Sequence, residues 1–255
     1  MQMSVTHEES VAVITWDDGE NRINHDSLAN FHAILDELEG RAGPLALVWT
    51  GTGKFFSNGL DLARFGSDPK ELASTLDALH RTVARLLLFP AYSVAALNGH
   101  TFAGGALLSC AADFRIMRVD RGYWCMNEAD IGLPLDDKLA EILFNRLPRS
   151  TAIEAMLTAR RFGAHDALAA GIVQAIAPQG EVLARAIDVA SAMASKNRNV
   201  LAQHKRIAFG EIAEYLNSGD SVPRTVRPAP RHSLDDSQSR RKSDSGDDLL
   251  DVAAE

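Results

Sequence analysis

Apolar residues along this chain alternate between short runs typical of strands and longer repeats typical of helices. Strands are predicted where the pattern has a period of two or forms a short continuous run, at residues 3–7, 11–16, 45–49, 92–97, 114–117, 123–126 and 172–176. Helices are predicted where apolar residues recur every three or four positions, at residues 28–38, 72–89, 106–112 and 200–216. From residue 136 to residue 216 nearly everything except the last strand has a helical pattern. This order predicts an α/β fold with a helical C-terminal third.

Local signals set the expected ends of these elements. Asp26 or Ser27 is available to cap the first helix, and Gly40 to end it. The segment around Phe55 and Phe56, which follows a glycine-containing turn, is predicted to be a loop.

Composition changes abruptly after Asn217, to serine, proline, arginine and aspartate with few large apolar residues. Such a stretch buries too little apolar surface to offset the entropy lost on ordering it. The expected organisation is an α/β core over residues 1–190, a C-terminal helical region over residues 191–217, and a polar, disordered tail over residues 218–255.

Length and charge narrow the functional classes. A chain of 255 residues with 46% hydrophobic content can form a sizeable core, and a net charge of -8 argues against a general nucleic-acid binder. Cys110 and Cys125 lack metal-like spacing, which favours buried thiols in a reducing compartment. No run reaches about 18 apolar residues, and the N-terminus has no cationic and apolar leader pattern. We therefore expect a cytoplasmic protein without a membrane span.

Two glycine-containing segments, residues 54–62 and 98–105, directly follow predicted strands or the turn after one. Glycine lets a ligand approach the backbone, and a helix that starts after such a loop presents free N–H groups to an anion. Turn geometry alone also explains glycines here, and from the residues alone it is the favoured interpretation. Neither segment has the phosphate-loop or the dinucleotide-binding pattern, so nucleotide hydrolysis and hydride transfer lack support.

Several motifs, taken in order, resemble the enoyl-CoA hydratase/isomerase family, also called the crotonase family. They lie at residues 56–62, 95–99, 103–105, 113–116, 127–134 and 164–173. The resemblance implies a spiral of β-β-α units with a helical C-terminal trimerisation region, in a homotrimer or a dimer of trimers. It also implies a fatty acyl-CoA thioester as substrate, so that coenzyme A enters with the substrate and no separate cofactor or metal is expected.

Carried over residue by residue, the resemblance assigns the chemistry to few groups. The backbone N–H groups of Leu60 and Gly104 would bind the thioester oxygen, and Glu128 would transfer protons. Family hydratases carry two glutamates, and the first of them, just after the glycine cluster, falls where this chain has Leu107. This pattern is most like Δ3,Δ2-enoyl-CoA isomerases, in which one carboxylate moves a proton from C2 to C4. Without the resemblance, a glutamate at position 128 would be interpreted as a solvated loop residue.

Further substrate or CoA contacts are expected around these groups. The expected residues are Arg22, Ile23, Ser57, Asn58, Gly59, Asp61, Arg64, Gly105, Leu107, Asn127, Leu133 and Pro134. Lys54, Lys205 and Arg206 are additional candidates for the CoA phosphates, although each alone is more often a solvated charge. Trp124 is expected in the core, and His100 is expected to be structural.

Other interpretations stay open on the same scaffold. They are another acyl-CoA reaction, such as that of a lyase, hydratase or thioesterase, and a non-catalytic CoA-binding paralogue. Family members continue with further helices after the region of Lys205, whereas this chain continues with the polar tail. Either the lid over the acyl-CoA comes from elsewhere, or the CoA site is more open, or the ending is disordered and activity is reduced.

Overall fold

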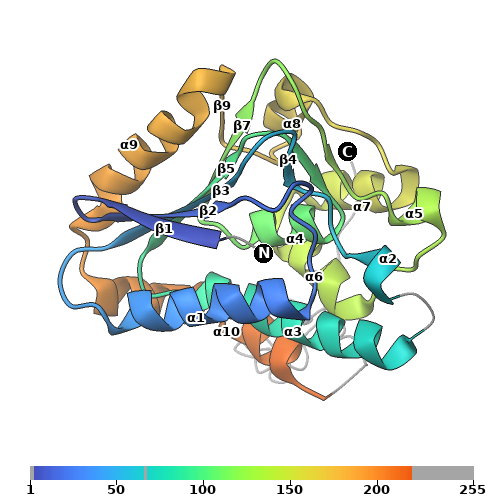
Figure 1. The fold of residues 1–255 in the computed structure, drawn as a ribbon, viewed down its shortest axis with the longest axis horizontal. Helices are drawn as coiled ribbons and strands as arrows, with labels where there is room; N and C mark the ends of the chain where they lie inside the picture. Colours follow the sequence, from blue (N-terminus) through green and yellow to red (C-terminus); the bar gives the residue numbers. More distant parts are fainter. Residues whose placement is uncertain (1–2, 66–67, 220–255) are drawn as a thin grey trace, which may run out of the picture. The chain divides into compact units, whose positions relative to one another are not determined.

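A six-stranded sheet organises this computed structural model, which describes residues 3–65 and 68–219 (Figure 1). The strand order is β1-β2-β3-β5-β7-β9, with β1 antiparallel to β2 and every other neighbouring pair parallel. The strands are β1 (Met3–Glu8), β2 (Val11–Trp16), β3 (Ala46–Gly51), β5 (Tyr92–Leu97), β7 (Phe114–Arg118) and β9 (Ala175–Ala177). All six residues of β3 are buried, which explains its continuous apolar run. The last strand lies at the C-terminal end of the predicted range 172–176 and beyond it.

A second sheet contains three short parallel strands in the order β4-β6-β8. They are β4 (Phe55–Ser57), β6 (His100–Phe102) and β8 (Trp124–Cys125). The prediction of a loop around Phe55 and Phe56 was wrong, and β6 was not predicted. Strands of two or three residues are too short to show a period-two pattern, so only pairing in space defines them.

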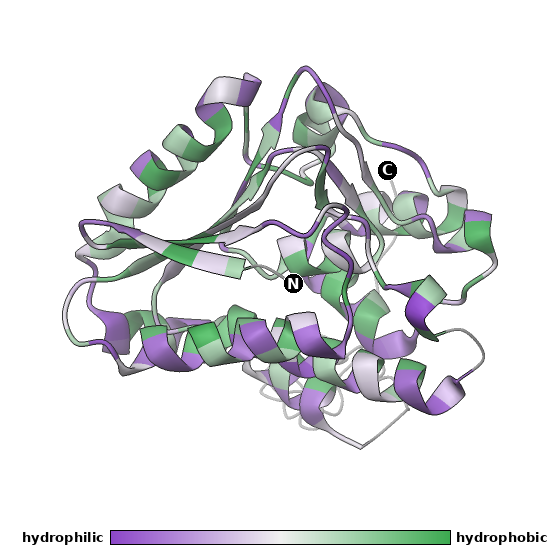
Figure 2. Ribbon diagram, in the orientation of Figure 1, coloured by the Kyte–Doolittle hydropathy of each residue, from purple (hydrophilic) through white to green (hydrophobic). Residues whose placement is uncertain are grey.

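Helices cover both faces of the large sheet (Figure 1). On one face α9 (Val182–Ala194) packs its buried alanines against the valines and alanines of β2, β3 and β5. On the other face lie α1 (His25–Gly40), α3 (Pro69–Leu88) and α4 (Gly104–Cys110), and α10 (Arg198–Asn217) packs on α3. Figure 2 shows the central strands predominantly apolar and α1 banded with polar and apolar residues, as expected for a helix with one buried face.

The first helix begins at a capping box. The Asn24 side chain accepts a hydrogen bond from the Ser27 backbone N–H, and the Ser27 hydroxyl accepts one from the Asn24 N–H. The predicted cap at Asp26 or Ser27 was therefore wrong by two or three positions, because Ser27 is the reciprocal partner rather than the cap. The predicted end at Gly40 is confirmed.

The remaining helical elements are short. They are α2 (Leu62–Phe65), α5 (Glu128–Ile131), α6 (Asp137–Arg146), α7 (Arg149–Thr158), α8 (Ala164–Ala169) and the 3-10 helix η1 (Gln179–Glu181). The expected boundary after residue 190 falls inside α9, and most of the expected tail, residues 220–255, lies outside the described residues. Within residues 3–65 and 68–219, no helix combines the length and apolar composition that crossing a bilayer requires.

Candidate active site

Three loops meet at the carboxyl ends of the short parallel strands. Asn58 follows β4, Ala103 follows β6, and Asn127 lies two residues beyond β8. Phe102 pairs with Cys125, and the Ala103 N–H donates to the Cys125 carbonyl at 2.9 Å. The carboxyl ends of parallel strands are where α/β proteins place ligands. The pairing of β4, β6 and β8 thus brings together three segments that lie far apart in the sequence.

These loops enclose a cavity of about 260 Å³ with a mostly apolar wall. Its apolar lining is Leu60, Leu62, Leu72, Leu76, Leu79, Ala103, Gly104, Leu107, Ile131, Leu133, Pro134, Leu135 and Leu139. Its polar lining is Arg22, Asn58, Asn127, Glu128 and Asp136. An apolar cleft with a few convergent polar groups is the usual form of a small-molecule site.

Two backbone donors are open in the cavity wall. In the described part of the chain, neither the Leu60 N–H nor the Gly104 N–H donates a hydrogen bond. Both residues line the cavity, and a Cβ built on Gly59 would lie 3.3 Å from the Gly104 nitrogen, so the two loops are in contact. Paired open donors of this kind can hold an oxyanion.

The backbone of both loops is unusual where they meet. Gly59 has a φ of +75°, and an added Cβ would lie 2.9 Å from the Ala103 Cβ. Ala103 itself has a φ of +50°, which costs an L-residue energy, and strain of this kind tends to cluster at functional sites. Hydrogen bonds on both sides hold this conformation, from the Ala103 N–H to Cys125 and from the Leu107 N–H to the Ala103 carbonyl at 3.1 Å.

Among the ionisable groups of the cavity lining, Glu128 has the pKa that its surroundings shift most. It is the first residue of α5, is half-buried, and its Oε2 is buried without a hydrogen-bond partner among the described residues. Burial, which penalises the charged form, raises the pKa of the Glu128 carboxyl from 4.5 to about 7, partly opposed by a backbone hydrogen bond. A carboxyl with such a pKa can both accept and return a proton at neutral pH.

Leu107 and Asn127 flank this carboxyl in the cavity lining. Leu107 is buried on α4, so the wall is apolar at the position where family hydratases carry their first glutamate. The Asn127 Oδ1 is buried and has no partner among the described residues. Glu128 therefore shares the cavity lining with the apolar Leu107 and the neutral Asn127, and Asp136 is the other carboxyl of the lining.

A sequence profile described as enoyl-CoA hydratase/isomerase matches residues 6–221. The chain belongs to the enoyl-CoA hydratase/isomerase family. It is 33% identical to a peroxisomal enoyl-CoA delta isomerase 2 of Arabidopsis thaliana over 212 residues, 78% of this chain and 88% of the relative. A solved structure of a probable enoyl-CoA hydratase from Mycobacterium tuberculosis matches at TM-score 0.79 and 30% identity, over 85% of this chain and 92% of that one. Human mitochondrial Δ3,Δ2-enoyl-CoA isomerase matches at TM-score 0.79 and 25% identity, over 85% and 86%.

The expected crotonase fold is therefore confirmed. Of the site residues expected from the family motifs, nine line one cavity in this family member. They are Arg22, Asn58, Leu60, Gly104, Leu107, Asn127, Glu128, Leu133 and Pro134. Their individual roles stay predictions.

Six expected residues do not line this cavity. They are Ile23, Ser57, Gly59, Asp61, Arg64 and Gly105. Ile23 and Asp61 belong to the pairing that supports the Leu60 loop, with the Ile23 N–H donating to the Gly59 carbonyl and the Asp61 N–H to the Ile23 carbonyl. Ser57 is buried, and its hydroxyl donates to the Asn21 carbonyl at 2.7 Å. Ile23, Ser57 and Asp61 therefore hold the loop backbone in place and do not face the cavity.

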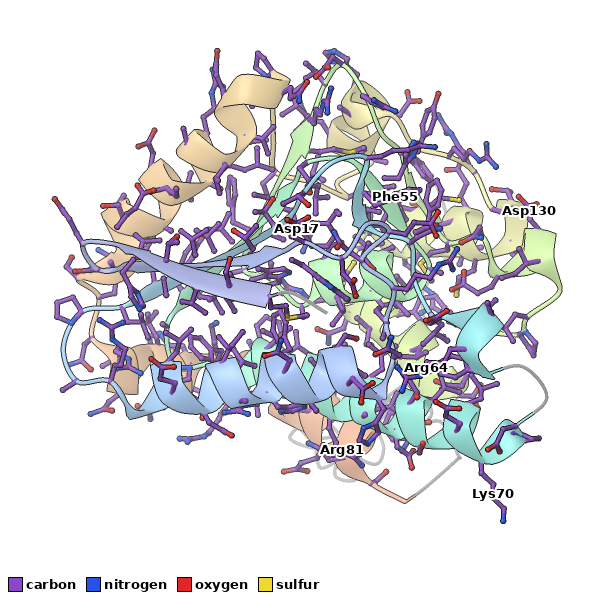
Figure 3. All side chains as sticks on the ribbon, in the orientation of Figure 1. Asp17, Phe55, Arg64, Lys70, Arg81 and Asp130 are labelled. Atoms are coloured by element: carbon purple, nitrogen blue, oxygen red, sulfur yellow. The ribbon has the colours of Figure 1, made fainter. Side chains whose placement is uncertain are left out.

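Arg64 and Lys205 are engaged in ion pairs. Arg64 contacts Asp26 at 2.7 Å and Glu71 at 3.2 Å, near the start of α1 and α3 (Figure 3). Lys205 was a candidate phosphate partner, and this interpretation is wrong. Its Nζ is buried, lies 2.6 Å from Asp113 Oδ2 and donates to the Ala91 carbonyl, because α10 packs that side chain into the core.

Asp136 is a cavity residue that sequence reasoning missed. It caps α6, accepting from the Leu139 N–H at 2.8 Å, and its other oxygen lies 2.8 Å from Nε2 of the buried His80. The His80 hydrogen bond and the Leu139 N–H lower the pKa of the Asp136 carboxyl despite its burial. The Asp-x-x-Leu cap pattern indicates a helix start, but nothing local indicates His80, which lies 56 residues away.

Trp124 and His100 are placed as expected. Trp124 is fully buried, and its Nε1 donates to the Ser109 hydroxyl on α4 at 3.2 Å. His100 packs among Phe55, Phe102 and Tyr123 and does not line the cavity. Asp130, two residues after Glu128 on α5, is exposed and does not line the cavity (Figure 3).

Proposed function

We propose that this protein is a Δ3,Δ2-enoyl-CoA isomerase, which converts a 3-enoyl-CoA into the conjugated 2-trans-enoyl-CoA. One observation carries the proposal: a single half-buried glutamate with a pKa of about 7 shares an apolar cavity with two open backbone N–H groups. The apolar Leu107 at the usual position of a second acid argues against water addition, which needs two proton-transfer groups.

In the proposed reaction, the thioester oxygen accepts hydrogen bonds from the Leu60 and Gly104 N–H groups. Glu128, as the carboxylate, removes a proton from C2, and the electron pair of that C–H bond is delocalised into a dienolate whose negative charge lies mainly on the thioester oxygen. The same carboxyl, now protonated, delivers its proton to C4, and the double bond moves from C3–C4 to C2–C3. Loss of one comparable donor in other enzymes costs about 3 to 4 kcal/mol.

The lining of the cavity supports a fatty acyl substrate. One wall of the cavity is apolar and suits an aliphatic tail. It is formed by Leu62, Leu72, Leu76, Leu79 and Leu139. Arg22 is the cationic residue of the lining, and its guanidinium is held by Glu20 at 2.7 Å and by the Leu60 carbonyl at 3.4 Å. In this proposal Arg22 contacts the CoA moiety at the end of the cleft where the thioester binds.

The experiment is to incubate the purified protein with 3-hexenoyl-CoA and follow the appearance of conjugated enoyl-CoA. Because Glu128 must be deprotonated to accept the C2 proton, kcat/KM is expected to rise about tenfold per pH unit below pH 7 and to level off above it. The Glu128→Gln variant is expected to lose at least about 1,000-fold in kcat, on the order of magnitude typical of a lost proton-transfer group. Full activity in that variant would refute the mechanism.

Asp136 favours one second candidate, an enoyl-CoA hydratase in which Asp136 supplies the second carboxylate. Its carboxyl lines the same cavity, but both of its oxygens already accept hydrogen bonds. The two candidates are separated with 2-hexenoyl-CoA in water, where a hydratase forms 3-hydroxyhexanoyl-CoA. Hydration that is abolished in the Asp136→Asn variant would favour the second candidate, whereas isomerisation retained in that variant favours the first.

A further inference from the structure

Two arginines, the buried Arg115 and the partly buried Arg146, converge on the C-terminal end of α4, the helix whose first residue is Gly104. Arg146, the last residue of α6, donates from Nε to the Cys110 carbonyl at 2.9 Å and from Nη2 to the Ala112 carbonyl at 2.6 Å. Arg115, on β7, donates from Nη1 to the same Ala112 carbonyl at 3.3 Å and from Nε to the Ile172 carbonyl at 2.5 Å. We call Arg115 and Arg146 the arginine clamp.

The charge of the arginine clamp has no carboxylate partner in the part of the chain that the structure describes. Asp113, the acidic group beside it, is engaged by Lys205 at 2.6 Å and by the Ser93 N–H and hydroxyl. Arg115 is 1% exposed, and burial lowers the pKa of both guanidinium groups. A buried cation is costly unless dipoles stabilise it, and here the stabilising dipoles are the carbonyls at the C-terminal end of α4.

Helix α4 links this clamp to the reacting end of the cavity. It is seven residues long, so its two ends are about 10 Å apart, and its N-terminal end carries the open Gly104 N–H. The clamp also ties α4 to α6, because Arg146 ends the helix whose Leu139 and capping Asp136 line the cavity. Phe209 on α10 packs against Arg146, whose guanidinium lies 4.6 Å from the centroid of the phenyl ring.

We propose that Arg115 and Arg146 are positioning residues for the oxyanion site. They hold α4 by its C-terminal carbonyls, so that the Gly104 N–H stays directed at the thioester oxygen, and their positive charge stabilises the enolate. This inference rests on the proposed function in one respect, that an enolate forms at Gly104. Neither arginine contacts the substrate.

Two contributions of the clamp are separable. At an effective dielectric constant near 20, a unit positive charge roughly 15 Å from an anion changes the equilibrium constant for forming that anion about fivefold. A misplacement of a donor by about 1 Å costs up to about 100-fold in rate. Removing Arg146 should therefore weaken enolate binding at least about fivefold, while binding of an acyl-CoA that cannot form an enolate changes little.

The test uses acetoacetyl-CoA, a β-keto thioester whose enolate absorbs in the near ultraviolet, and hexanoyl-CoA as a ground-state ligand. The fraction of bound acetoacetyl-CoA present as enolate is titrated against pH in the wild type and in Arg146→Met, Arg146→Lys and Arg198→Met. Arg198 is the matched control, because it also binds backbone carbonyls, of Pro90 at 3.1 Å and Glu39 at 3.2 Å, away from α4.

The expected result is an enolisation constant at least about fivefold lower in Arg146→Met, an intermediate value in Arg146→Lys, and a wild-type value in Arg198→Met. The dissociation constant of hexanoyl-CoA should stay near the wild-type value in all three. Arg146→Lys keeps the cation, so it carries the test if Arg146→Met does not fold. Equal enolisation in the wild type and the Arg146 variants would overturn the clamp proposal alone. If the wild type binds hexanoyl-CoA but does not stabilise the enolate, both proposals fall, whereas enolate stabilisation without isomerisation of 3-hexenoyl-CoA removes only the proposed reaction.

Discussion

Among single residues, the buried carboxyl of Glu128 predicts how stability depends on pH. Its pKa is about 7 in the folded protein and 4.5 in the unfolded chain, so folding favours the protonated form. The stabilisation from this group is fully present below pH 4.5 and is lost as pH rises through about 7. The Glu128→Gln variant cannot ionise, and it is expected to gain up to about 3 kcal/mol relative to wild type between about pH 4.5 and pH 8.

Urea unfolding of both proteins at about pH 4.5, 6 and 8 measures this difference. Glu37→Gln, at an exposed position of α1, is the control and should show no such trend. A constant difference between Glu128→Gln and wild type across these pH values would mean that the Glu128 carboxyl is solvated, and the proposed proton-transfer role would lose its physical basis.

At this scale the sequence indicates Glu128 as the candidate acid, and its place after the apolar strand 123–126 predicts a pKa raised by partial burial, but the packing that produces this burial was not predictable. Its position within a family motif and the leucine at position 107 are both legible in the sequence. The altered pKa of Glu128 depends on burial by segments far away in the chain, which no local pattern contains. Asp136 shows the same limit, since its partner His80 lies on α3 and enters the site only through packing.

At the level of elements, long periodic segments were predictable and short paired ones were not. The predicted helix 72–89 corresponds to α3, and the predicted strand 92–97 to β5. Strands β4 and β6 escaped prediction because they pair across the fold and have almost no pattern of their own, whereas β8 lies within the predicted strand 123–126. The glycines beside these strands are visible in the sequence, but the sequence does not show what each is needed for. Gly59 has a positive φ, whereas Gly105 allows the close approach of α4 to β4.

Gly105 predicts how closely α4 must approach β4. A Cβ at this position would lie 2.7 Å from both the Cβ and the carbonyl oxygen of Ser57. The Gly105→Ala variant is expected to push α4 away from β4, to lose about 1 to 3 kcal/mol of stability, and to lose activity beyond that because Gly104 moves as well. Gly210→Ala on α10 is the matched control, since a Cβ there meets nothing within 4 Å and should stabilise the helix by up to about 1 kcal/mol.

Chemical denaturation and kcat/KM for 3-hexenoyl-CoA, measured for both glycine variants, check this prediction. Wild-type stability and turnover in the Gly105→Ala variant would show that α4 and β4 can separate freely, against the close packing described above.

At the level of the whole molecule, charge placement was the least predictable feature. A lysine on an amphipathic helix is usually a surface residue, and sequence reasoning therefore made Lys205 a candidate phosphate partner. The packing of α10 against α3 instead buries it against Asp113 and the Ala91 carbonyl. The fold class was predictable from the order of elements together with the family motifs. The homotrimer or dimer of trimers stays a prediction.

The Lys205–Asp113 pair joins the C-terminal helix to the central sheet, and its loss should destabilise the whole unit. Lys205→Met removes the cation and leaves the Asp113 carboxylate with Ser93 as its hydrogen-bond partner, so we expect a loss of about 3 to 5 kcal/mol. The double variant with Asp113→Asn should recover part of this loss, because no unpaired carboxylate then remains. KM for 3-hexenoyl-CoA should stay near the wild-type value in both, whereas Arg22→Gln, in the cavity lining, should raise it. A large rise in KM with unchanged stability in Lys205→Met would return Lys205 to the phosphate-binding role.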